Sequence, residues 1–74
     1  IRVNSIAPGF IKSSYYKNFK ENKSKLYKWT LSRIPLDKWG ENLDVAYLTL
    51  FLLSENSKYI NGQVIKIDGG WTST

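Results

Sequence analysis

Two side chains in this 74-residue sequence have the spacing of a proton-transfer pair, Tyr16 and Lys20. On a helix they would share one face, and an ammonium group beside a phenol lowers the pKa of the phenol. An ordinary lysine-rich helix gives the same spacing without any chemistry. The chain has no histidine and no cysteine. Imidazole bases, thiol chemistry, disulfides and Cys/His metal sites are therefore excluded.

Two glycine-containing turns are the next candidates for a site. Pro8 has no amide hydrogen and Gly9 permits positive φ, so the chain can turn sharply there and bring backbone groups against a ligand. From the residues alone, a turn that merely ends a strand is the simpler interpretation. Asp68-Gly69-Gly70 has the composition of a metal or phosphate loop. One carboxylate makes a poor cation site, so we interpret this segment as a structural turn.

Positive charge is concentrated in one segment of the chain. Eleven Lys/Arg against six Asp/Glu give a net charge of +5, and six of the lysines fall between positions 12 and 28, among aromatic residues. Basic residues interleaved with aromatic rings can bind single-stranded nucleic acid. A helix that turns its rings inward and its lysines to solvent has the same composition. We favour this second interpretation and expect no nucleic acid as a partner.

The elements that must position these residues begin with an expected strand over Ile1–Ile6, which the Pro8-Gly9 pair ends. The Ser13-Ser14 pair supplies candidate caps for a helix over about residues 15–31. The apolar spacing of that helix is loose, and residues 22–24 form a weak patch in it. Beyond it, the residue before Pro35 is expected to be extended, because proline disfavours a helical neighbour on its N-terminal side.

A second helix is expected over residues 41–54, where carboxylates in the first turn complement the helix dipole. Two apolar stripes run along it, one through Val45, Leu48 and Leu52 and the other through Ala46, Leu50 and Leu53. A helix that is apolar on nearly all sides must be covered on nearly all sides. We therefore expect a sheet against one stripe and another subunit against the other.

The last expected element is a short apolar strand over residues 63–68, between an Asn61-Gly62 turn and Gly69-Gly70. Such a run is typical of strands covered on both faces, as in parallel sheets. Two strands joined by a helical crossover lie parallel. The order of elements predicts part of an α/β layered fold.

The length of the chain limits what it can do alone. A 74-residue chain is at most one small domain and buries only about 60% of its unfolded surface. It begins with Ile1 and contains no Met, so we expect a piece of a longer chain. The longest nearly apolar run, Val45–Leu53, is far shorter than the about 20 residues of a membrane-spanning helix. We therefore expect no membrane association.

Several segments resemble the C-terminal portion of the short-chain dehydrogenase/reductase family. Arg2–Ser13 is similar to the family's Pro-Gly segment, and Arg33–Gly40 is similar to the stretch before its penultimate helix. Phe51–Ser54, Tyr59–Gln63 and Asp68–Trp71 are similar, in that order, to the C-terminal end of the family. Together these segments span almost the whole chain.

The resemblance implies an α/β fold: the C-terminal part of a Rossmann-type doubly wound parallel sheet, with residues 1–74 forming the C-terminal portion of a single NAD(P)-binding domain. It implies NAD or NADP as the cofactor, bound at Pro8, Gly9, Ile11 and Ser13. The backbone of Ile11 would bond the nicotinamide carboxamide. The Ser13 hydroxyl stands where threonine is common in the family and would bond the carboxamide or the phosphates.

Residues 14–32 carry no family pattern, and the family varies there with its substrate. The resemblance implies that this segment is a substrate loop that closes as a lid and excludes water. Substrate-binding residues are then expected at Phe10, Tyr15 and Trp29. Trp71 is a further candidate for the border of a substrate pocket, whereas Trp39 is expected to pack in a core.

No catalytic residue of the family is expected within this chain. In the family, the glycine-rich phosphate turn, the serine and the Tyr-x-x-x-Lys acid/base pair would precede Ile1. The Tyr16–Lys20 pair follows the Pro-Gly segment instead, in the substrate-loop region. It is therefore not interpreted as the catalytic pair.

The resemblance implies a cytoplasmic oxidoreductase that moves a hydride between NAD(P)(H) and a small alcohol or carbonyl substrate. Sugar acids or polyols are favoured as substrates, 3-oxoacyl thioesters are the alternative, and the lysines of the lid would suit an anion. The resemblance also implies a homotetramer or a dimer that associates through the 41–54 helix and the 63–68 strand. A different hypothesis is a truncated, non-catalytic fragment that acts only as an association piece.

Overall fold

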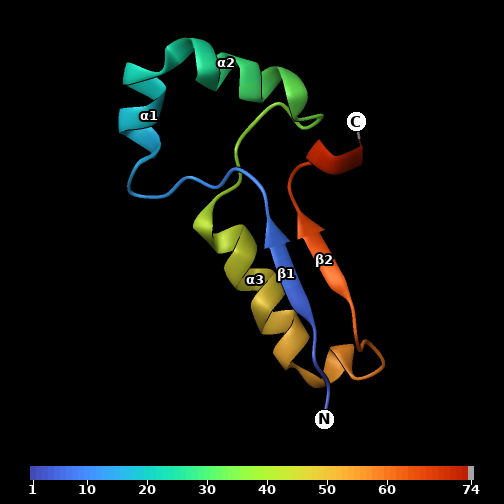
Figure 1. The fold of residues 1–74 in the computed structure, drawn as a ribbon. Coiled ribbons are helices and arrows are strands. Elements are labelled where there is room, and N and C mark those ends of the chain that lie inside the picture. Colours follow the sequence, from blue (N-terminus) through green and yellow to red (C-terminus); the bar gives the residue numbers. More distant parts are fainter. Residues whose placement is uncertain (74) are drawn as a thin grey trace.

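The computed structural model describes residues 1–73, which form two strands and three α-helices (Figure 1). In chain order these are β1 (Ser5–Pro8), α1 (Tyr16–Asn22), α2 (Ser24–Arg33), α3 (Asn42–Leu53) and β2 (Val64–Ile67). Two short 3-10 turns follow α3 and β2, at Glu55–Ser57 and Trp71–Ser73. Both strands point toward the end of the molecule where α1 and α2 lie, and α3 runs along β1 (Figure 1).

The strands β1 and β2 pair in parallel, as predicted, with Ser5 opposite Val64 and Pro8 opposite Ile67. The amides of Ser5 and Gly9 donate toward β2, to the carbonyls of Gln63 (2.8 Å) and Ile67 (3.1 Å). Because amides alternate in direction along a strand, Pro8 has its missing N–H on the side away from β2, where no strand pairs with β1 among residues 1–73.

The bounds of both strands differ from the prediction. The expected strand over Ile1–Ile6 is shifted, because regular pairing begins only at Ser5 and continues through Pro8. Val3 instead contacts the turn before β2: its amide donates to the Asn61 side chain (2.9 Å), and its carbonyl accepts from Gly62 (2.8 Å). The strand expected over residues 63–68 is confirmed as Val64–Ile67.

Helix α3 confirms the second expected helix. Its first turn is closed by Asp44, whose carboxylate accepts the amide hydrogen of Glu41 at 2.7 Å, a favourable place for negative charge. The stripe of Val45, Leu48 and Leu52 is half-buried, whereas Ala46, Leu50 and Leu53 are exposed. One apolar stripe is thus partly covered within the described residues, and the other is open.

The single helix expected over residues 15–31 is wrong, because two helices form there. The helical backbone breaks at Lys23 (φ −125°, ψ 46°), between Asn22 and Ser24, two residues that favour turns and caps over helix interiors. The predicted serine caps are also wrong, since α1 begins after Tyr15 without a side-chain cap. The extended conformation expected before Pro35 is confirmed at Ile34 (φ −97°, ψ 113°).

The described residues form a thin layer of 44 × 26 × 15 Å with a radius of gyration of 14.4 Å. A compact domain of this length would have a radius of about 11 Å. Only two apolar side chains, Ile34 and Trp39, are fully buried among the described residues. Large apolar side chains such as Leu50, Tyr59 and Val64 are exposed. Hydrophobic burial, the main force that stabilises folds, is therefore small within the described residues.

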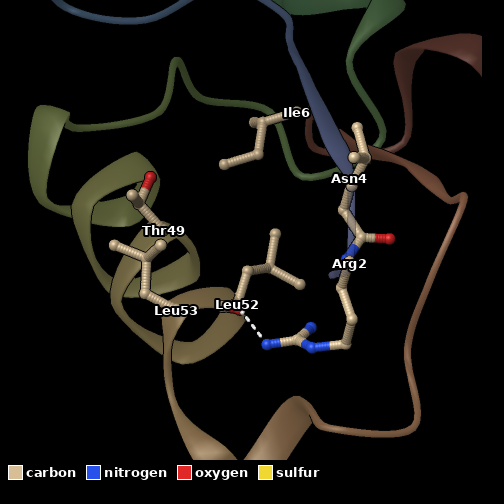
Figure 2. Close-up of a pocket in the computed structure, with 7 residues that line it drawn as sticks. Arg2, Asn4, Ile6, Thr49, Leu52 and Leu53 are labelled. Atoms are coloured by element: carbon tan, nitrogen blue, oxygen red, sulfur yellow. Dashed lines mark hydrogen bonds between the residues drawn. The ribbon is translucent and has the colours of Figure 1, made fainter.

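Arg2 joins the start of β1 to the end of α3 (Figure 2). Its guanidinium donates to the carbonyl oxygens of Leu52 (3.0 Å), Ser57 (3.0 Å) and Ile60 (3.1 Å). The last carbonyls of a helix have no intrahelical partner and carry partial negative charge, so a cation there is doubly favourable. Beside this contact, Ile6, Thr49 and Leu53 line a groove of about 390 Å³ between β1 and α3.

Replacing Arg2 tests this connection. Arg2→Met keeps a long apolar stem but removes all three hydrogen bonds. We expect the free energy of unfolding of the natural polypeptide to fall by about 1–3 kcal/mol, the range for losing partners of buried polar groups. Arg2→Lys can replace only part of these hydrogen bonds. Its free energy of unfolding should lie between those of the parent and Arg2→Met. Urea unfolding followed by circular dichroism measures the change, and an unaltered midpoint in Arg2→Met would contradict the role.

Candidate functional site

The carboxyl ends of β1 and β2 lie side by side and carry the Pro8-Gly9 turn and Asp68. Ligands of open α/β sheets bind outside this edge. Gly9 lies so close to β2 that a Cβ there would stand 2.7 Å from the Asp68 Cβ and 3.0 Å from its Cα. No side chain fits at such a distance from backbone atoms. Gly9 is therefore required by the close approach of the two chain segments.

Asp68 closes the turn after β2. Its Oδ1 accepts the Gly70 amide (3.0 Å), and its Oδ2 accepts the hydroxyl (2.8 Å) and amide (3.2 Å) of Thr72. These hydrogen bonds, the Thr72 hydroxyl first, lower the pKa of the Asp68 carboxyl. Its oxygens are thus engaged in the turn, which agrees with a structural role. No group of three possible metal ligands occurs among residues 1–73.

The segment after Gly9 is held from the other side by Gly40. The Gly40 amide donates to the Phe10 carbonyl (2.9 Å), and the Lys12 amide donates to the Gly40 carbonyl (2.8 Å). In this parallel bridge the amide and carbonyl of Ile11 point away from Gly40, so both are presented to the opposite side of the segment. A Cβ on Gly40 would stand 2.8 Å from the Ile11 Cδ1. Sequence reasoning missed Gly40, because no local signal reveals such a contact.

An ion pair fixes the far end of this segment. The Lys12 ammonium lies 3.0 Å from the Glu41 carboxylate at the start of α3. The hydrogen bond to Glu41 raises the pKa of Lys12. The pair is exposed to solvent, so it orients the segment more than it stabilises the fold.

The predicted site residues are only partly brought together. Pro8, Gly9 and Phe10 line an apolar cavity of about 390 Å³ at the carboxyl edge, together with Trp71 and Asp68. Ile11 follows on the Gly40 bridge, outside that cavity lining. Ser13 is exposed, and its hydroxyl accepts the Tyr15 amide hydrogen at 3.4 Å. The Tyr15 side chain is 76% exposed and does not line the cavity.

A row of rings connects the cavity to α2. Trp71 meets Phe10 edge-on with centroids 5.0 Å apart, and it meets Trp29 edge-on at 5.6 Å. Such pairs add favourable energy beyond their buried area. Trp71 thus joins the substrate residues predicted at Phe10 and Trp29, and it is the link between them.

Trp39 lies at the centre of a second cluster of rings. It is 8% exposed, as the prediction of a core position required. The rings of Tyr16, Phe19 and Tyr27 pack around it with centroids 5.3, 5.3 and 5.7 Å away. These three rings of the basic segment therefore face inward, as expected, whereas Tyr15 and Trp29 of the same segment are exposed.

The Tyr16–Lys20 pair does not form an acid/base couple. The Lys20 ammonium lies over the ring faces, 5.9 Å from the Tyr16 centroid and 5.6 Å from that of Tyr27, as a cation–π contact. The two phenol oxygens are 3.0 Å apart. This hydrogen bond raises the pKa of Tyr27 to about 12, the opposite of the shift that activates a phenol for proton transfer.

Two parallel strands with a cavity at their carboxyl edge, flanked by helices, define part of a Rossmann-type α/β protein. A model of the family described as enoyl-(acyl carrier protein) reductase matches residues 1–72. The chain therefore belongs to the short-chain dehydrogenase/reductase family, as the sequence motifs indicated.

Two of the curated relatives of the chain are a reductase and a dehydrogenase. A 3-oxoacyl-[acyl-carrier-protein] reductase of Thermotoga maritima is 49% identical over 95% of the chain. A 2-dehydro-3-deoxy-D-gluconate 5-dehydrogenase of Bacillus subtilis is 40% identical over 99% of it. The chain spans 27% and 28% of the length of these relatives.

Solved structures give the same result. A provisionally named 2-deoxy-d-gluconate 3-dehydrogenase of Agrobacterium tumefaciens, with bound NADP, matches the whole chain with a TM-score of 0.90 at 35% identity. A 4-hydroxyisoleucine dehydrogenase complexed with NADH matches the whole chain with a TM-score of 0.89 at 38% identity. The chain covers 30% of each of these proteins. The predicted Rossmann-type fold is confirmed. Among residues 1–73, no helix is long and apolar enough to cross a membrane.

The phenol pair predicts an alkaline pH dependence. Since Tyr27 has a folded-state pKa of about 12 against 10.0 for an unperturbed tyrosine, its contribution to stability is complete below pH 10 and is lost as pH rises toward 12. Absorbance at 295 nm should show one phenol that titrates late in the natural polypeptide. Tyr16→Phe removes the hydrogen-bond partner and should shift this phase to lower pH, and Tyr27→Phe should abolish it. An unchanged titration in Tyr16→Phe would refute the assignment.

Proposed function

We propose that residues 1–74 form the C-terminal portion of a single NAD(P)-binding domain in an oxidoreductase that exchanges a hydride with a small alcohol or carbonyl substrate. The observation that carries this proposal is the apolar cavity at the carboxyl edge of β1 and β2, beside the close approach of Gly9 to Asp68. NADP or NADH is bound in the similar structures named above. A bound nicotinamide would supply the hydride acceptor or donor.

We assign the cofactor to Pro8, Gly9, Ile11 and Ser13. The edge fits a flat ring, because Gly9 leaves it without a side chain and Phe10 and Trp71 make the cavity apolar. The amide and carbonyl of Ile11, turned away from Gly40, are a donor and an acceptor suited to a carboxamide. Ser13 has an exposed hydroxyl that can reach a polar group of the same ligand.

Residues 14–32 are proposed as the substrate lid, with Phe10, Tyr15 and Trp29 as substrate contacts. The row of Phe10, Trp71 and Trp29 supports this role for two of the three, because it continues the apolar cavity toward α2. For Tyr15, the support is its position at the start of α1 with an open side chain. Lysines exposed on both lid helices would attract an anionic substrate.

Two substrate classes follow from the comparisons. Sugar acids or polyols are favoured by the gluconate-type dehydrogenases among relatives and solved structures. Reduction of 3-oxoacyl thioesters is the alternative, supported by the 49% identity to the Thermotoga maritima reductase. NADH and NADPH oxidation with 3-oxoacyl thioesters, compared with NAD and NADP reduction with sugar acids, separates the two. A cytoplasmic location is part of the same proposal and is tested by cell fractionation.

We assign no catalytic acid or base to this chain. The Tyr16–Lys20 geometry does not activate a phenol, and the sequence has no histidine or cysteine. The 74 residues by themselves are therefore proposed to be inactive. The two hypotheses then differ in whether the natural polypeptide turns over a substrate or acts only as an association piece. Turnover by the natural polypeptide supports the enzyme, and its absence with every substrate class supports an association piece.

Removing one hydroxyl tests the cofactor assignment. In the natural polypeptide, Ser13→Ala should raise the KM for the nicotinamide cofactor about two- to tenfold, as expected for one lost hydrogen bond of about 0.5–1.5 kcal/mol. Ser13→Thr keeps the hydroxyl and should behave like the parent. Steady-state kinetics at saturating second substrate provide both values. Equal KM values for all three proteins would remove Ser13 from the site.

The open stripe of α3 and the exposed face of β2 are proposed as a homo-oligomer interface. Leu50 and Leu53 of this stripe are exposed, and so are Tyr47 and Phe51 beside it and Val64 of β2. Exposed apolar side chains that gather on one face are typical of an association site. A tetramer or a dimer would bury it in symmetric fashion.

A charge placed on the stripe tests the interface. Leu50→Glu should lower the mass of the natural polypeptide in sedimentation equilibrium by a whole-number factor, because burying an unpaired carboxylate is costly. Glu55→Gln, a change of charge beyond the end of α3, serves as the control. A Leu50→Glu protein that keeps the parent's mass would exclude this face.

A further inference from the structure

Helices α1 and α2 pack against each other but have no comparably extensive backbone packing on the strands or on α3 within the described residues. The chain just after α2 is fixed by the Leu36 amide on the Gly69 carbonyl (3.1 Å), and Lys12 lies over the Tyr16 ring. Further contacts of the two helices with the rest of the structure are between rings. Tyr16, Phe19 and Tyr27 contact Trp39 in the loop between α2 and α3, and Trp29 contacts Trp71. The position of the lid relative to the sheet therefore depends on a few side chains.

Trp39 is oriented on its lid side by a buried hydrogen bond. Its indole N–H donates to the Thr30 hydroxyl oxygen at 2.8 Å, and that hydroxyl donates to the Tyr27 carbonyl at 2.6 Å. Thr30 is 1% exposed. A buried N–H that has one acceptor strongly favours the single orientation that satisfies it. The indole and α2 therefore move as one body.

On its other side, Trp39 touches the segment assigned to the cofactor. Phe10 stacks on the indole with centroids 5.1 Å apart and an interplanar angle of 29°. Phe10 is also held without Trp39, through the Gly40 amide on its carbonyl (2.9 Å) and the edge contact with Trp71 (5.0 Å). Loss of Trp39 would thus remove the ring contacts of Tyr16, Phe19 and Tyr27 and loosen the lid, which keeps the Trp29–Trp71 contact. It would leave the segment after Gly9 in place.

We propose that Trp39 is a positioning residue that holds the α1–α2 lid at the carboxyl edge of the sheet. It acts through the rings of Tyr16, Phe19 and Tyr27 and through Thr30, and it does not itself take part in hydride transfer. Both lid helices lie beyond the arrowheads of the two strands (Figure 1), where a lid would cover the cavity. The identity of the ligand under this lid depends on the proposed function. The anchoring of the lid by Trp39 does not depend on it.

Tryptic cleavage tests the anchoring without any ligand. The lid offers cleavage sites after its lysines at positions 17, 20, 23, 25 and 28. Cleavage of a native protein follows the population of the open form. In the natural polypeptide, Trp39→Leu should be cut in the lid at least about tenfold faster than the parent. Tyr15→Leu deletes a ring from the same lid without touching Trp39 and should be cut within twofold of the parent rate.

The hydrogen bond is tested separately with a variant of the same shape. Thr30→Val removes the acceptor of the indole N–H and should speed lid cleavage at least about threefold. Thr30→Ser retains the hydroxyl and should restore the parent rate. Unchanged cleavage in both Trp39→Leu and Thr30→Val would overturn the proposal.

Ligand binding then distinguishes a positioning role from a purely structural one. Trp39→Leu should bind NADH or NADPH with a Kd within twofold of the parent, while the KM for the carbonyl substrate rises at least about fivefold. Loss of cofactor binding in Trp39→Leu and Thr30→Val together would mark Trp39 as a core residue of the fold and overturn the proposal. If the parent binds neither cofactor, the proposed function fails, whereas the cleavage rates still decide whether Trp39 anchors the lid.

Discussion

The close contact between the Gly9 backbone and Asp68 is the constraint on which the rest of this structure depends. It fixes the distance between the ends of β1 and β2, where the parallel ladder finishes with the Gly9 amide on the Ile67 carbonyl. The segment after β1 then leaves the sheet toward Gly40, and the segment after β2 enters the turn closed by Asp68. A largely apolar cavity forms between them, because Pro8, Phe10 and Trp71 border it and the Asp68 carboxylate is engaged in its own turn.

Among the contacts that hold the helices to this pair of strands, two lie at opposite ends of the strands. Arg2 holds the C-terminal end of α3 through three backbone carbonyls, and the aromatic cluster around Trp39 holds α1 and α2. The two differ in kind. The contact of Arg2 with the end of α3 places a charge at the negative end of the helix dipole and resists movement. The cluster around Trp39 consists of ring contacts of about 0.5–1.5 kcal/mol each. Helices α1 and α2, which we propose as the lid, are consequently the part of the structure expected to move at modest cost.

The sequence was sufficient for the elements with strong local signals and insufficient where long-range contacts decide. The stripes of α3 and the apolar run of β2 predicted those elements within a residue or two. The single helix over residues 15–31 failed because turn-forming residues at 22–24 outweighed a loose apolar spacing, and the break lets Tyr16 and Tyr27 meet. Pro8 was expected beyond the strand. Its missing N–H faces away from β2 only because of the register between β1 and β2, and the sequence of β1 alone does not reveal this register. The site motifs were recognisable, but the roles of Gly40 and Trp71 depend on contacts with residues far along the chain.

We propose above all that the edge of the sheet beside Gly9 binds a nicotinamide cofactor. The most direct test is equilibrium binding of NADH and NADPH to the natural polypeptide and to Gly9→Ala, followed by fluorescence. We expect saturable binding of at least one cofactor, weakened about fivefold or more by the alanine, whose Cβ would clash with Asp68 at a cost of about 1–3 kcal/mol. Circular dichroism shows whether the variant is folded, and the two affinities are compared only in folded protein. Absence of saturable binding for both cofactors, or equal affinity in a folded Gly9→Ala protein, would contradict the account.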